Sequence, residues 1–312
     1  MKQAKIFLSI LLGICFFTAC SNEDDPVVIV TAQPLVIHVE ETPMNPEATT
    51  GREITRGTIV DNSNFSAFGL RYGDEDTYTY TVTKSGNTWT ADPNYAPLGT
   101  NTFYAFSNGT FIWNAGSPYV QFTVDETISA QKDLVVSKSA PITGNEVNLS
   151  FTHVCSAVQF DICKTAGMAD YIIEVNTVEL CNVVKEGDYY YGTNSWTLGS
   201  TKTNYTLNTA PFTLGTTPAD LDMASGSQYL FMIPQTLTAW DKTAISGSTT
   251  GCYLHLNCKI RKGGTYKIGS AGSYGDAYLP GGGEFEQNTK QKITLRVGTA
   301  LRNASGTQIT SL

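Results

Sequence analysis

Charged residues are scarce in this sequence of 312 residues: Asp, Glu, Lys and Arg together make up 15% of it. About 25% is usual for a soluble globular domain. The deficit excludes a coiled coil, a helical bundle and an acidic disordered tail, because these classes are rich in charged residues. The sequence also has no long run of Ala, Glu, Lys and Leu at helical spacing, which argues against a doubly wound α/β enzyme.

Catalytic and metal-binding motifs are missing as well. The three histidines, His38, His153 and His255, lie on separate segments, and none belongs to an H-x-x-x-H or H-E-x-x-H motif. The sequence contains no G-x-S-x-G motif, no P-loop and no G-x-G-x-x-G motif. We therefore expect no enzymatic activity, no cofactor and no metal site. His153 follows a core-like Phe and is expected to be structural, whereas His255 is expected to be exposed on its strand.

The number of cysteines argues against a complete disulfide framework. Apart from Cys15 and Cys20 near the N-terminus, five remain, and an odd number cannot pair completely. They show no C-x-x-C motif and no metal-ligand spacing. Cys252 and Cys258 share one face of a predicted strand with Leu254 and Leu256, so we expect both to be buried thiols.

What the sequence does contain points to β-structure. It has 42 threonines beside 28 glycines and 16 tyrosines, and Thr and Tyr favour strands whereas Gly favours turns. Residues 78–83 alternate Tyr, Thr, Tyr, Thr, Val, Thr, which predicts a strand with threonines on its outer face. The buried face changes between Leu149 and Val158, so we expect a bulge or break within residues 153–157. Two β-sandwiches fit the length.

The N-terminus carries a secretory signal. Lys2 and Lys5 precede an apolar run over residues 6–17, and small residues lead to Cys20. The run is too short for a stable transmembrane helix, which needs about 20 residues. Cys20 follows Phe-Thr-Ala and resembles the acylated cysteine of a bacterial lipobox, although an ordinary cleavage site is the alternative. Without the signal peptide the chain has 18 basic and 28 acidic residues, a net charge of −10, which disfavours nucleic acid as a partner.

The order of short motifs resembles the fimbrillin family, lipoprotein precursors of type V pilus subunits. Behind the lipobox and the acidic residues 21–25, the motifs are Thr55-Arg56-Gly57, Phe68-Gly69, Phe103-Tyr104-Ala105-Phe106, Gln131-Lys132-Asp133-Leu134, Leu149-Ser150-Phe151-Thr152-His153, Gly187-Asp188-Tyr189 with Trp196, and Phe231-Met232-Ile233-Pro234-Gln235. Each motif is weak alone, whereas their order and spacing cover nearly the whole chain.

The resemblance implies an all-β fold of two transthyretin-like β-sandwich domains in tandem after a lipoprotein signal peptide. The expected organisation is a signal peptide over residues 1–19, an acidic tether with a removable first strand over 20–56, an N-terminal domain over 57–165 and a C-terminal domain over 166–312.

It also implies assembly by strand exchange. A surface protease cuts after an arginine, the first strand leaves, and a strand from another pilus subunit fills the groove. Arg56 matches the processing position, and Arg52, which is followed by an acid, is the competitor. Leu35, Ile37 and Val39 alternate as the removable strand should.

The C-terminus leaves two interpretations open. Ile293, Leu295 and Val297 alternate as a last strand or a donor strand should. Either Lys292–Leu301 is itself the donor strand, or the protein accepts a strand and donates none, as a tip subunit would.

The expected location is the outer membrane, through acyl chains on Cys20, and the fimbrium at the cell surface. Other pilus subunits are the expected partners, with a host or bacterial surface glycan or protein as a further one. The alternative function is a surface-anchored glycan-binding lipoprotein that is not polymerised, with sugars stacking on Trp89, Trp113, Trp196 and Trp240.

Overall fold

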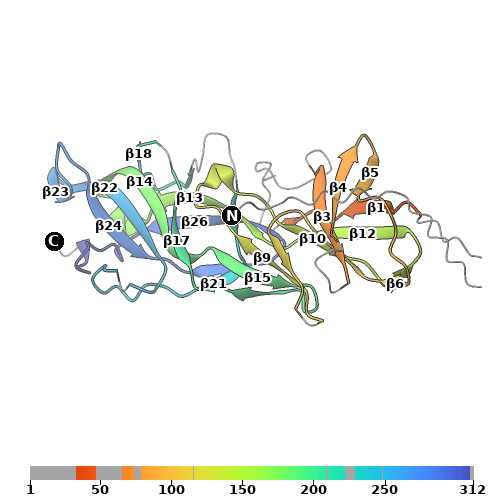
Figure 1. Ribbon diagram of the computed structural model, residues 1–312. Coiled ribbons are helices and arrows are strands. Elements are labelled where there is room, and N and C mark those ends of the chain that lie inside the picture. Colours follow the sequence, from red (N-terminus) through yellow and green to blue (C-terminus); the bar gives the residue numbers. More distant parts are fainter. Residues whose placement is uncertain are drawn as a thin grey trace, which may run out of the picture. The chain divides into compact units, whose positions relative to one another are not determined.

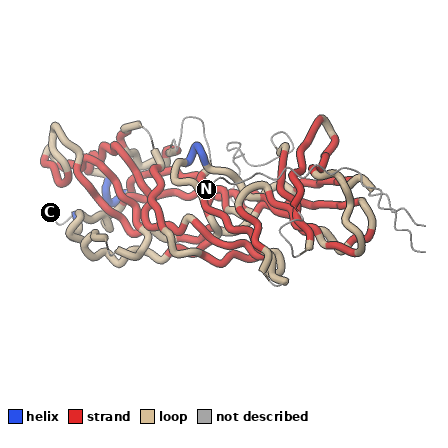
Figure 2. The backbone as a smooth tube through the Cα atoms, viewed as in Figure 1, coloured by secondary structure: helices blue, strands red, loops and turns tan. Residues whose placement is uncertain are grey.

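The computed structural model describes residues 33–46, 65–73, 79–114, 116–208, 210–221, 229–247 and 249–309, all within one compact unit. These residues form 26 strands and two single-turn 3-10 helices, η1 (Ile128–Ala130) and η2 (Ala166–Met168) (Figure 2). The predicted all-β fold is therefore confirmed. In this part of the chain, neither helix has the length and apolar character that a membrane crossing requires.

The largest sheet has seven strands. In sheet order they are β1 (Val36–Glu41), β12 (Glu146–His153), β10 (Val135–Lys138), β7 (Phe103–Phe106), β3 (Ala67–Tyr72), β4 (Thr79–Ser85) and β5 (Thr88–Asp92). Side chains of a strand point alternately to opposite faces. On β4, Tyr80 and Val82 are buried while Thr79, Thr81 and Thr83 are exposed, as the alternation in the sequence predicts.

The other sheets are built mainly from later residues. The five-stranded sheet comprises β19 (Ala219–Asp220), β13 (Ser156–Lys164), β26 (Thr289–Val297) and β2 (Asn45–Pro46), with β20 (Leu230–Met232) also on β13. The six-stranded sheet comprises β17 (Lys202–Thr206), β14 (Tyr171–Val184), β22 (Tyr253–Lys262) and β23 (Thr265–Ile268), with β18 (Phe212–Thr213) on β14 and β24 (Gly275–Pro280) on β22.

Three smaller sheets complete the structure. One has four strands, β16 (Ser195–Leu198), β15 (Glu186–Tyr190), β9 (Tyr119–Thr123) and β8 (Thr110–Ile112). The two-stranded sheets pair β11 (Ile142–Thr143) with β6 (Thr100–Asn101), and β21 (Gln235–Leu237) with β25 (Gly283–Phe285).

The buried side chains form two hydrophobic clusters. The first-sheet cluster lies under the seven-stranded sheet and includes Leu70, Phe103 and Phe151. The main cluster gathers side chains from residue 44 to residue 309. Two strands that precede residue 165, β9 and β13, pair with β15 and β26, which follow it. The two transthyretin-like domains with a boundary at residue 165 stay a prediction.

The predicted break between two strands of opposite parity is confirmed. β12 ends at His153 and β13 begins at Ser156, so two residues separate them. Leu149 and Phe151 are buried before the break, and Val158 is buried after it, on β13. β12 contributes to the first-sheet cluster and β13 to the main cluster, so the break marks the point where the chain passes between them.

Several motifs that are far apart in the sequence contact one another. His153 Nδ1 lies 2.6 Å from Asp133 Oδ2, and both side chains are almost completely buried. The backbone N–H of Phe231 donates to Gln131 Oε1 over 2.8 Å. The Trp196 indole N–H donates to the Val154 carbonyl over 2.8 Å. The contacts of His153 and Val154 link the β12–β13 break to segments on both sides of it in the chain.

We predict that His153→Ala lowers the free energy of unfolding by about 3–5 kcal/mol, because it leaves the buried Asp133 carboxylate without its imidazole partner. Chemical denaturation measures the change. His38→Ala is the matched control, since His38 is exposed on β1 and surface substitutions usually change stability by less than about 0.5 kcal/mol. Equal denaturation midpoints for the two variants would contradict the prediction.

Candidate functional site

The first strand lies at the edge of the seven-stranded sheet with one face in the core. Leu35 and Ile37 are 4% and 7% exposed, and Val39 is half-buried against the first-sheet cluster. Val36 and His38, which lie between them, face solvent. The alternation seen in the sequence is therefore present, and the apolar side chains fill part of a core that is otherwise built by later residues.

β1 is parallel to β12, its only strand partner among the described residues (Figure 1). Val36 pairs with Glu146 and Glu41 with Phe151. At the far end, the Thr42 N–H donates to the Phe151 carbonyl over 3.0 Å. No tight turn can join two parallel strands, so side-chain burial and the ladder with β12 contribute to holding β1 in place.

The segment that contains β1 also reaches the main cluster. Met44, three residues beyond β1, is 2% exposed and belongs to that cluster. β2 then pairs in parallel with the start of β26, Asn45 with Thr289 and Pro46 with Lys290. Residues 33–46 thus contribute to both hydrophobic clusters and to two sheets.

The predicted lipidation and processing residues lie outside the described part of the chain. This applies to Cys20, to Arg52 and Arg56, and to the predicted signal peptide over residues 1–19. In the sequence, Arg52 and Arg56 follow the last residue of β2 by six and ten positions.

The last strand is firmly placed in its sheet. β26 runs parallel to β13 over eight residue pairs, from Ala157–Lys290 to Lys164–Val297. Leu295 and Val297 are buried, and Ile293 packs against the main cluster.

An ion-pair network supports this strand. The ammonium group of Lys292, on β26, lies 3.7 Å from a carboxylate oxygen of Asp161 on β13, and it also contacts Asp220 on β19. The network therefore joins three neighbouring strands of one sheet through a single lysine.

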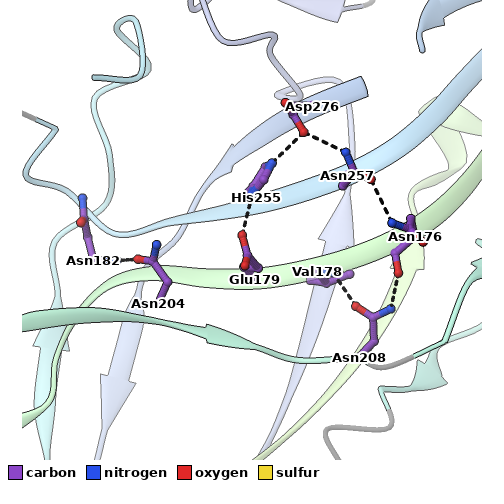
Figure 3. Close-up of polar contacts among 9 residues, drawn as sticks. All are labelled: Asn176, Val178, Glu179, Asn182, Asn204, Asn208, His255, Asn257 and Asp276. Carbon is purple, nitrogen blue, oxygen red and sulfur yellow. Dashed lines mark hydrogen bonds and ion pairs between the residues drawn. The ribbon is translucent and has the colours of Figure 1, made fainter. Parts of the chain in front are cut away.

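His255 belongs to a polar cluster on the outer face of the six-stranded sheet (Figure 3). Its Nδ1 lies 2.7 Å from Glu179 Oε2 and its Nε2 3.0 Å from Asp276 Oδ1, and its ring stacks on Tyr278. Hydrogen bonds from Asn257 and from His255 hold the pKa of Asp276 below its usual range. His255 is on the predicted face, but it is half-buried between two carboxylates rather than freely exposed.

This polar cluster connects strands through carboxylate, imidazole and amide groups. Glu179 is on β14, His255 and Asn257 are on β22, and Asp276 is on β24, so each contact links neighbouring strands. Cross-strand pairs of this kind stabilise sheets. No group of three or more His, Cys, Asp or Glu residues in the described ranges could hold a metal ion. The cross-strand contacts support a structural role for this cluster.

The cysteines and tryptophans are part of the cores. Burial raises the pKa of the Cys181, Cys252 and Cys258 thiols to about 12, so they are protonated and unreactive at neutral pH. All five cysteines of the described residues are free and buried, which confirms the prediction for Cys252 and Cys258. Trp240 is 2% exposed. The other three tryptophans are partly buried and pack against the clusters.

We predict that Ile37→Ala weakens the seating of β1, because truncating a buried Ile costs about 2–5 kcal/mol. Hydrogen exchange of the β1 and β12 amides measures the effect, which should appear as faster exchange in both strands. His38→Ala, on the opposite face of the same strand, is expected to leave exchange unchanged. If both variants exchanged like the wild type, the burial of Ile37 would not be what holds β1.

Comparison with known proteins identifies the family. A fimbrial protein from Bacteroides vulgatus ATCC 8482 is similar in structure, with a TM-score of 0.54 and 14% identity, over 87% of this chain and 99% of that one. A suspected cell adhesion protein from Bacteroides eggerthii DSM 20697 matches with a TM-score of 0.46 and 12% identity, over 89% of this chain and 91% of that one. None of the curated proteins matches. The family model for fimbrillin-like proteins matches residues 48–311. Because that match spans most of the sequence, the resemblance seen in the motifs is confirmed, and the chain belongs to the fimbrillin-like family.

Proposed function

We propose that this chain is a fimbrial subunit or tip adhesin that is exported as a lipoprotein, cut after Arg56 and assembled by accepting a strand from another subunit. Membership of the family supports a fimbrial or adhesin subunit of a cell-surface appendage. The observation that carries the finer proposal is the position of residues 33–46. They insert apolar side chains into both clusters, and they precede both candidate cleavage sites.

Loss of residues 33–46 would expose a groove that is energetically costly to leave empty. Leu35, Ile37 and Met44 are buried, and burying such a side chain contributes about 1.5–3 kcal/mol, so the three together contribute about 5–9 kcal/mol. The net stability of a whole domain is only about 5–15 kcal/mol. The backbone edge of β12 would also lose its partner. A strand from a neighbouring subunit would restore both kinds of interaction.

The position of the C-terminal segment supports an accepting role. To be donated, β26 would have to leave its pairing with β13. The residues that follow are also packed: Leu301 and Ile309 are completely buried, and Arg302 bridges to both Tyr278 and Gln308. We therefore propose that residues 289–309 remain in their own fold while the groove of β1 accepts a partner strand.

Membrane attachment is the second part of the proposal. Acyl chains on Cys20 would hold the precursor at the outer membrane until cleavage after Arg56 releases the remainder, because several chains anchor a protein far more firmly than one. The family points to a structural role, and we propose that the chain has no enzymatic activity. The glycan-binding alternative would use exposed tryptophans, and all four tryptophans pack in or against the cores.

We predict that Arg56→Ala abolishes processing at this site and keeps the protein out of sheared surface fibres. N-terminal sequencing of the wild-type protein from these fibres should give Gly57 as the first residue. Arg52→Ala is the matched control and should leave both processing and assembly unchanged. A surface fraction that holds only the full-length acylated protein, together with normal fibres when the chain is deleted, would refute the proposal.

A further inference from the structure

The extended residues 33–35, directly before β1, are hydrogen-bonded on both edges of the chain. On one edge, the Leu35 N–H donates to Asn94 Oδ1 over 3.0 Å, and the Ala96 N–H donates to the Gln33 carbonyl over 2.7 Å. On the other edge, Asn145 Nδ2 donates to the Pro34 carbonyl over 2.8 Å.

These contacts follow the geometry of an extended chain. Successive residues of a strand direct their backbone groups to opposite edges. Residues 33 and 35 therefore face the loop that follows β5, and residues 34 and 36 face the start of β12, where the Val36 N–H donates to the Asn145 carbonyl over 2.8 Å. These hydrogen bonds involve only backbone atoms of residues 33–36, so they do not depend on which side chains the strand carries.

The loop that supplies Asn94 and Ala96 is braced from the core. The Tyr80 hydroxyl, on β4, donates to the Tyr95 carbonyl over 3.1 Å, between the two contact residues. Tyr80 is 1% exposed, and burial raises its pKa, so the hydroxyl stays protonated and can donate. Asn101 Nδ2 donates to the Leu98 carbonyl further along the same loop. A braced site binds without having to be ordered first.

We propose that Asn94, Ala96 and Asn145 form an end clamp that binds the backbone of whichever strand occupies the β1 position. This inference rests on the proposed function, and the occupant is an extended strand of another pilus subunit running in the direction of β1. Such a strand has to extend three residues beyond the first pair of the β12 ladder, Val36–Glu146. A shorter strand could complete the ladder with β12 but would leave the clamp unfilled.

The two asparagines have opposite roles, and this gives matched variants. Asn94 accepts a hydrogen bond and Asn145 donates one through its side chain. Asn94→Asp keeps an acceptor oxygen, whereas Asn145→Asp replaces the donor by an acceptor that faces a carbonyl. Asn148→Ala is the control on the same strand, because Asn148 is exposed in the middle of β12.

The test uses the full chain, cut after Arg56 in the presence of a fluorescent peptide with the sequence of residues 33–46. Fluorescence anisotropy measures the dissociation constant of the peptide from the cut protein. Losing one neutral hydrogen bond should weaken binding by about 3- to 10-fold. We expect this loss for Asn94→Ala and Asn145→Asp, and wild-type binding for Asn94→Asp and Asn148→Ala.

A modified peptide tests whether the clamp binds through hydrogen bonds to the peptide backbone. N-methylation at Leu35 removes the N–H that donates a hydrogen bond to Asn94 Oδ1. The modified peptide should therefore bind the wild type more weakly. It should bind Asn94→Ala about as well as the unmodified peptide does, because both changes remove the same hydrogen bond. N-methylation at Ile37 is the control, because that N–H is directed to the same edge, where no described strand pairs with β1. Equal losses in the wild type and Asn94→Ala would overturn the clamp.

Two further outcomes separate the clamp from the proposed function. If the cut protein captures the peptide and every variant binds it like the wild type, the accepting groove stands and the clamp is wrong. If it captures no peptide, the accepting groove and the clamp both fail. Hydrogen exchange of the uncut chain tests the contacts independently: Asn94→Ala should speed exchange at the Leu35 amide, and unchanged exchange would overturn the clamp.

Discussion

Parallel pairing between distant segments is the constraint on which this structure depends. β1 pairs with β12 across a separation of 110 residues, and β13 pairs with β26 across 133 residues. Neither pair can be closed by a hairpin, since a tight turn joins only antiparallel strands. The loop that connects such a pair contributes little to its geometry. Under the proposed strand exchange, a strand from another molecule would replace β1 without changing the ladder, provided that it supplies the same burial.

Strands β12 and β13 each provide the edge on which a distant strand pairs, β1 on β12 and β26 on β13. They follow each other in the chain, separated by two residues, and each has a parallel partner from a distant segment. The buried pair of Asp133 and His153 lies at the end of β12, and the indole of Trp196 binds the Val154 carbonyl directly after it. These contacts do not involve residues 33–46. The position of β12, on which β1 pairs, is therefore supported by contacts among later residues.

Local features of this fold follow from the sequence, and its pairings do not. The inward positions of Leu35 and Ile37, the break after His153 and the buried thiols of Cys252 and Cys258 each depend on a period of two along one strand. The alternation of residues along β1 shows which side chains face inward. It does not show which distant strand pairs with β1. The polar links of His255 were missed for the same reason, because Glu179 and Asp276 come from neighbouring strands.

Side-chain burial and backbone contacts have different roles in the strand exchange proposed for the β1 position. Its apolar side chains contribute most of the binding energy, and an odd shift in register would turn them to solvent. A shift of two residues keeps the same faces inward, so burial alone distinguishes it only by side-chain size. The proposed end clamp would add a length requirement without specifying side chains, since Asn94 and Asn145 bind backbone atoms. Under the proposed function, alternating burial and backbone contacts at one end together would suit a strand of a related but different subunit.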